Sequence, residues 1–316
     1  MRPLRAVPTA LPPPPLARPD AVRRLSLDVA RRLDGLVQGD HLGHLPGPGT
    51  EAAEARAYGP GDDVRRLDWA VTARTCEPHV RTTVAERELE TTLVVDLSSS
   101  MSFGTAGAEK RDVALALAAA FLHLCSRPGD RVAGLVVGGD GLRSLPARAG
   151  RAGSLATLST LLRQPRSETG IGPGLGAALT ALTRRPRRRG LTVVLSDLGD
   201  PVDTWQRPLR LVAAKHEVVV VQVVDRRELA LPDVGVLHLV DPETGRQEQL
   251  RTSARTRQRY AAAAAERAEQ QRRSVLAAGA SHVAVRTDAD WLPQLVRFLA
   301  TRRRLRGAGR RSGGPA

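Results

Sequence analysis

Three side chains that can give oxygen ligands to a metal ion follow one apolar run of this sequence. In LVVDLSSSMSFG, residues 93–104, Asp96, Ser98 and Ser100 stand at alternate positions where the run ends. Carboxylate and hydroxyl oxygens are hard ligands, which Mg²⁺ and Mn²⁺ prefer. One carboxylate and two hydroxyls leave such an ion short of ligands, so water or an acidic side chain of another protein would complete its shell. The spacing therefore points first to metal-dependent binding of a partner, and second to catalysis.

A second carboxylate ends another apolar run. Asp197 closes LTVVLSD, residues 191–197. In an open α/β sheet, ligands bind beyond the carboxyl ends of the strands, near the point where the strand order reverses. We therefore expect Asp197 to reach the same edge as Asp96. The structural alternative is that Ser100 or Ser102 caps the next helix while Asp96 closes a turn.

The elements that would position these residues alternate along the chain from about residue 90. This rhythm predicts an α/β fold with a doubly wound, mostly parallel sheet, which we assign to residues 91–304. The predicted strands are 91–97, 131–138, 191–198, 217–224 and 282–287. The predicted helices are 108–126, 151–163, 174–184, 204–215, 254–279 and 290–304. A hairpin is expected within 234–252, before the long Ala-rich helix.

The two ends of the chain differ in composition from this region. Residues 1–20 are rich in Pro and Ala, and we expect a disordered lead-in. Residues 21–90 are expected to hold an amphipathic helix over 21–37 and then a small, irregular accessory subdomain with short strands, the last at 79–84. The basic, Gly-rich segment 305–316 is predicted to be a disordered tail.

Two parts of the sequence resemble known families. DLSSSMSFG matches the DxSxS metal-ion-dependent adhesion motif (MIDAS) of von Willebrand factor type A (vWA) domains, and VVLSDLGD looks like the third metal loop of that fold. RAYGPGDDVRRLDWAVTART, residues 56–75, resembles the signature of the bacterial family DUF58, whose members join this block to a type A domain. The resemblance covers roughly residues 22–304 and implies that this region has a Rossmann-like type A fold.

The resemblance also implies roles for the oxygen-bearing residues. Ser98 and Ser100 would bind Mg²⁺ or Mn²⁺ directly, while Asp96 and Asp197 would hold its waters. The second loop of the family normally supplies a Thr. In SETGIGPGLGAAL the sequence departs from this pattern, because Pro173 stands at that position and Thr169 lies four residues earlier. Thr169 completes the set of expected metal ligands.

A protein partner is a further implication of the resemblance. Members of the family are typically encoded beside MoxR-type AAA+ ATPases, with which they are thought to act in assembling or remodelling other proteins. In the upstream block, Arg65, Asp68, Trp69 and Arg74 could form a charged contact surface. The alternative is that the aspartates of the block pair with neighbouring arginines, and that Trp69 is packed, as a lone Trp more often is.

Composition limits the other functions. The net charge of +15 comes from 46 arginines and two lysines, so a polyanion or nucleic-acid binder is the alternative, although the abundance of Arg, Ala, Gly and Pro also fits a GC-rich genome. The segment 104–112 lacks the GK[ST] ending of a P-loop, which argues against nucleotide binding there. The longest apolar stretch, 113–125, is too short to cross a bilayer. A metal-dependent hydrolase is the third hypothesis. We expect a non-enzymatic, cytoplasmic protein-interaction module.

Overall fold

The computed structural model describes residues 55–59, 62–81, 90–125, 129–167, 172–184, 189–240 and 246–311. These residues belong to two compact units, one within 44–89 and the other from Glu90 onward. The predicted lead-in, the helix over 21–37 and Thr169 lie outside the described residues. Among the described helices, none is both long enough and apolar enough to span a membrane.

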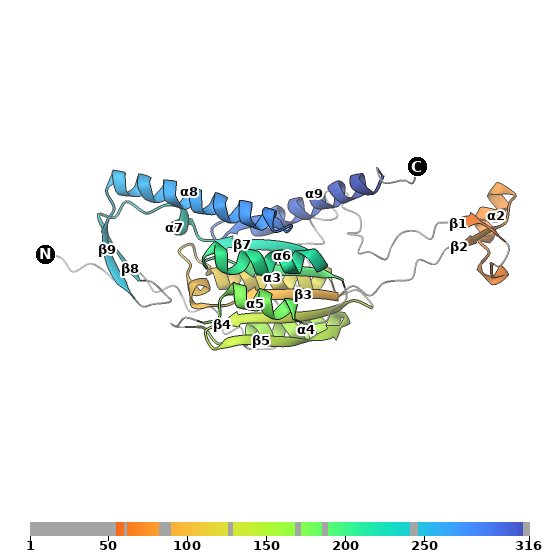
Figure 1. The fold of residues 1–316 in the computed structure, drawn as a ribbon, viewed down its shortest axis with the longest axis horizontal. Coiled ribbons are helices and arrows are strands. Elements are labelled where there is room, and N and C mark those ends of the chain that lie inside the picture. The colour runs from red at the N-terminus through yellow and green to blue at the C-terminus, as the bar shows by residue number, and fades with distance from the viewer. Residues whose placement is uncertain are drawn as a thin grey trace. The chain divides into compact units, whose positions relative to one another are not determined.

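The larger unit is built on a six-stranded sheet (Figure 1). Its strands are β3 (Glu90–Asp96), β4 (Arg131–Gly138), β5 (Gly141–Ala149), β6 (Leu191–Ser196), β7 (Glu217–Val224) and β10 (Ser281–Arg286). Their order is β10-β7-β6-β3-β4-β5, and every neighbouring pair is parallel except β4 with β5. From β3 the chain builds outward to β5 and then returns to the other side of β3 as β6. The strand order therefore reverses between β3 and β6, which makes the sheet doubly wound.

Helices cover both faces of this sheet. One face packs against α3 (Lys110–Leu124), α4 (Gly150–Leu162) and α9 (Trp291–Arg311). The other packs against α5 (Leu175–Thr183), α6 (Val202–Lys215) and α8 (Ala254–Ala277). The five predicted parallel strands and six predicted helices are all present, and their ends agree within two residues except at the carboxyl end of α9.

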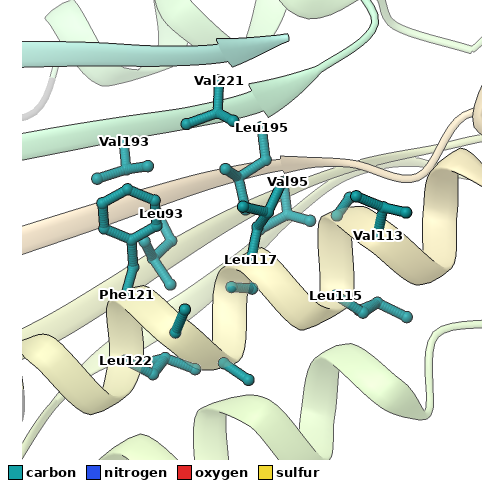
Figure 2. Packing of buried hydrophobic residues seen from close by; sticks show 14 of the residues in the cluster. Leu93, Val95, Val113, Leu115, Leu117, Phe121, Leu122, Val193, Leu195 and Val221 are labelled. Carbon is teal, nitrogen blue, oxygen red and sulfur yellow. The ribbon is translucent and has the colours of Figure 1, made fainter. Parts of the chain in front are cut away.

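The central strands are apolar because both of their faces are covered. In β3, Leu93 and Val95 point to the face of α3, whereas Val94 belongs to the core on the opposite face. Figure 2 shows Leu93 and Val95 beside Leu117 and Phe121 of α3. Each fully buried side chain of this size stabilises the fold by about 1.5–3 kcal/mol. A strand that is buried on both sides therefore has an unbroken run of Val and Leu in its sequence.

Two features differ from the sequence predictions. The antiparallel edge strand β5 was not predicted, because its sequence is largely exposed and polar and contains Pro146, which an edge strand tolerates. The predicted disordered tail over 305–316 is wrong for residues 305–311, since α9 continues to Arg311. Ala, Leu and Arg are good helix formers, and their helix propensity favours this continuation despite Gly307 and Gly309.

Shorter elements complete the unit. The predicted hairpin is present as β8 (Val236–Val240) and β9 (Gln247–Arg251), which pair antiparallel. The single-turn helix α7 (Arg226–Leu229) follows β7, and the 3-10 helix η2 (Ser99–Ser102) follows β3.

The smaller unit contains a two-stranded antiparallel sheet of β1 (Ala55–Ala57) and β2 (His79–Arg81). Between them lie the 3-10 helix η1 (Val64–Arg66) and helix α2 (Trp69–Thr75). The predicted strand over 79–84 is described only as far as Arg81.

Candidate functional site

Asp96 is the last residue of β3, and its carboxylate is buried at the carboxyl edge of the sheet with 5% of the residue exposed. Its Oδ1 accepts hydrogen bonds from the backbone N–H of Ser98 (3.0 Å) and from Ser98 Oγ (2.6 Å). Its Oδ2 accepts one from Ser196 Oγ, at the end of β6, at 2.7 Å. The carboxylate is therefore held between the two strands at which the strand order reverses.

The two predicted serine ligands lie together beside this carboxylate. Ser98 Oγ is 3.2 Å from Ser100 Oγ in η2. Helix α3 is capped by Glu109, whose side chain forms a capping box with Asp112. Neither Ser100 nor Ser102 caps α3, so that part of the structural alternative is wrong, whereas Asp96 does close a turn through the backbone N–H of Ser98. Their alternate spacing brings the hydroxyls of Ser98 and Ser100 into one cluster with Asp96.

Asp197 follows β6 directly and lies at the same edge, where it contacts a buried lysine. Asp197 Oδ2 accepts a hydrogen bond from Lys110 Nζ at 2.6 Å, and its Oδ1 accepts one from the backbone N–H of Gly199 at 2.9 Å. Lys110 Nζ also donates to Glu228 Oε1 of α7 at 2.5 Å. The Lys110 side chain is 1% exposed, and the Glu228 side chain is 36% exposed. Sequence reasoning missed this ion pair, because a single Lys at a helix start carries no signal of burial.

The two buried carboxylates have opposite pKa shifts. Burial and the charge of Asp197 raise the pKa of Asp96 to about 6, although hydrogen bonds from Ser98 and Ser196 oppose the rise. Burial would also raise the pKa of Asp197, but the contact with the Lys110 ammonium outweighs it and lowers the pKa. Asp197 therefore has the lower pKa of the two carboxylates, and Asp96 is the one that lacks a cation among its hydrogen-bond donors.

A chain of buried amides fixes the loop that carries Asp197. Gln222 Nε2 donates to the backbone oxygen of Asp197 (3.1 Å) and to Gln271 Oε1 (2.9 Å). Gln271 Nε2 donates to the backbone oxygen of Leu198 (2.7 Å). Sequence reasoning also missed these glutamines, which come from β7 and α8 and lie far from residue 197 in sequence.

The loop before α5, which is the second loop of the site, is held by a contact with the loop after β6, which is the third. The backbone N–H of Leu175, at the start of α5, donates to Asp200 Oδ2 at 2.6 Å. A Cβ on Gly174 would lie 2.4 Å from the same oxygen, which explains a glycine at this position. Pro173 is described in this loop, whereas the candidate ligand Thr169 lies outside the described residues. The described residues contain no group of three or more His, Cys, Asp and Glu side chains that could hold a metal ion.

The candidate contact residues of the smaller unit lie on or beside α2. Asp68 caps this helix, because its Oδ1 accepts from the backbone N–H groups of Ala70 (3.1 Å) and Val71 (3.2 Å). Trp69 is 71% exposed, so this Trp is not packed within the smaller unit. Arg65 and Arg74 are also exposed. The surface of this unit therefore presents an indole and two guanidinium groups.

Together these observations define an α/β domain whose doubly wound sheet carries two carboxylates and two serine hydroxyls at the point where its strand order reverses. The model of the family described as "Protein of unknown function DUF58" matches residues 54–270, and the chain belongs to this family. Uncharacterised proteins of Mycobacterium tuberculosis (Rv1480) and Mycobacterium bovis (Mb1516) are each 46% identical to it over 305 residues, which cover 94% of this chain and 96% of theirs.

Solved structures with similar folds were also found. BatB from Bacteroides thetaiotaomicron is 16% identical with a TM-score of 0.41, over 67% of this chain and 98% of BatB. A von Willebrand factor type A protein from Catenulispora acidiphila is 12% identical with a TM-score of 0.40, over 71% of this chain and 42% of that protein. The family assignment rests on the sequence matches, and the fold on the strand order described above.

Proposed function

We propose that this protein is a non-enzymatic protein-interaction module, which binds an acidic group of a partner protein at the carboxyl edge of its sheet through a divalent metal ion. The observation that carries the proposal is the cluster in which Ser98 Oγ lies 2.6 Å from Asp96 Oδ1 and 3.2 Å from Ser100 Oγ. Neighbouring ligands of an octahedral Mg²⁺ are about 3 Å apart. The 3.2 Å between the oxygens of Ser98 and Ser100, the two expected direct ligands, fits that requirement.

The charge of the cluster supports the same conclusion. Asp96 and Asp197 are buried, and Lys110 neutralises only Asp197. Ser98 and Ser100 would hold the ion directly, with Asp96 beside them, while Asp197 and Thr169 remain the further ligands suggested by the family resemblance. Bound Mg²⁺ or Mn²⁺ would supply an open coordination position for an acidic oxygen of the partner.

The family resemblance suggests a MoxR-like AAA+ ATPase as the partner. Trp69, Arg65 and Arg74 of the smaller unit would add a second contact, because exposed Trp and Arg side chains are the residues that most often dominate protein interfaces. Asp68 would contribute by holding the start of α2.

A pull-down from native cell extract tests this function. The tagged protein is used with Mg²⁺ and with EDTA, and bound proteins are identified by mass spectrometry. We expect an AAA+ ATPase with Mg²⁺, and less of it with EDTA or with the Ser98→Ala, Ser100→Ala double variant. The matched control is Ser99→Ala, Ser102→Ala, since both of these hydroxyls are buried without a hydrogen-bond partner in the described structure.

The outcomes separate the parts of the proposal. Absence of an AAA+ ATPase from every sample refutes the partner. Equal amounts in all samples refute the metal-dependent mechanism while the interaction survives. Loss of binding with rising salt, without an effect of EDTA, favours a charge-driven polyanion binder instead.

A further inference from the structure

Lys110 is a fully buried ammonium at the edge of the candidate site. Its side chain is 1% exposed, and Nζ lies 2.6 Å from Asp197 Oδ2 and 2.5 Å from Glu228 Oε1. A buried charge is costly unless opposite charges and hydrogen bonds compensate it. The two carboxylates come from separate loops, after β6 and after β7, so Lys110 ties these loops to the start of α3.

The position of Lys110 in its helix does not explain its presence. It is the first residue of α3, where the helix dipole favours anions and disfavours cations. The Phe103 ring, whose centroid is 5.9 Å from Nζ, adds a weak contact at most. The two carboxylates must therefore compensate both the burial and the dipole.

The two buried aspartates of the site are partnered differently. Asp197 contacts the Lys110 ammonium, one backbone N–H and the Ser100 side chain. Asp96 contacts only uncharged donors, from Ser98 and Ser196, within the described part of the chain. A cation is thus already present at Asp197, whereas Asp96 is without one among the described residues.

We propose that Lys110 is a resident cation of this site, which competes with a divalent metal ion for Asp197 and thereby lowers the affinity for metal. The inference rests on the proposed function, because it assumes that Asp96, Ser98 and Ser100 bind the ion. With Lys110 in place, Asp197 is held in one orientation without metal. The metal ion is then held by Asp96, Ser98 and Ser100 and is repelled by the ammonium.

Titration of the purified full chain with Mn²⁺ in a calorimeter tests the proposal. Lys110→Met removes the charge and keeps most of the side-chain length, so we expect Mn²⁺ to bind roughly tenfold more tightly or better, because Asp197 is released and a repulsive charge is gone. Lys110→Arg keeps the charge and should bind Mn²⁺ like the wild type. Lys215→Met, at the exposed end of α6, is the matched control, since Lys215 is the other lysine of the chain. Unchanged or weaker binding by a folded Lys110→Met variant overturns the proposal.

A second pair of variants avoids the risk that Lys110→Met does not fold. In the wild-type background, Asp197→Asn should weaken Mn²⁺ binding far less than Asp96→Asn, which should abolish it, because Lys110 already engages the Asp197 carboxylate. Equal losses in the two variants overturn the proposal. If no protein, wild type or variant, binds Mn²⁺, both the metal-dependent mechanism of the proposed function and this inference are refuted. If the wild type binds Mn²⁺ and the Lys110 variants bind it equally well, only this inference is refuted.

Discussion

Asp225 offers a quantitative test of how the carboxyl edge is held together. The residue follows β7 and is 0% exposed. Its carboxylate accepts hydrogen bonds from the backbone N–H of Thr105 (3.0 Å), Thr105 Oγ1 (2.6 Å), Thr287 Oγ1 (2.7 Å) and the backbone N–H of Arg227 (2.8 Å). One side chain therefore joins the loop after β3, the start of α7 and the end of β10.

The expected effect follows from these four donors. A buried donor that loses its acceptor costs about 1–3 kcal/mol, and water will reach some of the donors in a variant. We therefore expect Asp225→Ala to lower the free energy of unfolding by about 4 kcal/mol. Asp225→Asn keeps the shape but turns an amide NH₂ toward a donor, so a loss of about 2 kcal/mol is expected.

The same carboxylate predicts a pH dependence. Burial would raise the pKa of Asp225, but the hydrogen bonds from Thr105 and Thr287 outweigh burial and lower it. A folded-state pKa below the unfolded value, about 3.9, means that the stabilisation is complete above that value and is lost as the pH falls through the folded pKa. The difference in stability between wild type and Asp225→Asn should therefore shrink below about pH 4.

Urea unfolding followed by far-UV circular dichroism measures both effects. The control is Glu266→Ala on the exposed side of α8, which should change the free energy of unfolding by less than about 0.5 kcal/mol. A loss below about 1 kcal/mol for Asp225→Ala, or a difference that stays constant from pH 7 to pH 3, would refute the reasoning.

Three other predictions concern the core, the second loop and the buried lysine. Phe121→Ala should lower the free energy of unfolding by about 3–5 kcal/mol in the same urea assay, because the ring is 2% exposed and fills the core between α3 and the sheet (Figure 2). Gly174→Ala should lower the free energy of unfolding by about 1–3 kcal/mol, since the new Cβ would meet Asp200 Oδ2. This loss should be smaller in an Asp200→Ala background, and additive effects of the two changes would contradict the contact. An amine-reactive reagent should modify Lys215 and leave Lys110 unmodified until the protein is unfolded, as peptide mass spectrometry would detect; early modification of Lys110 would contradict its burial.

The parts of the fold that the sequence predicts are those with local signals. Central strands such as β3 and β7 are buried on both faces, so their Val and Leu runs stand out against polar loops. The edge strand β5 gives no such signal, because Leu145 is its only buried residue. Its pairing is determined by a tight turn after β4, in which Gly141 has φ +124°. The pattern of hydrophobic residues in the sequence does not predict that conformation.

The residues of the site also divide into those with a local sequence signal and those without one. Asp96, Ser98 and Ser100 lie within five residues, and Asp197 ends a recognisable strand, so their meeting at one edge follows from the fold class. Lys110, Ser196 and Gln271 could not be found in this way. Each is an ordinary polar residue in its own segment, and each acquires its role from a partner that lies at least 70 residues away in sequence.

The loop that carries Asp197 shows why so many polar residues surround the site. Leu198 has φ +56°, a left-handed conformation that costs a residue with a side chain about 1 kcal/mol or more. Two contacts compensate this cost, because the N–H of Leu198 donates to Ser196 Oγ at 3.0 Å and its carbonyl oxygen accepts from Gln271. Ser196 Oγ in turn donates to Asp96. The hydroxyl that supports the strained turn therefore also orients the other carboxylate, so the geometry of Asp96 and of the Asp197 loop depends on one side chain. Ser196 at the end of β6 thus helps, together with Lys110, to keep two acidic groups that repel each other close at this edge.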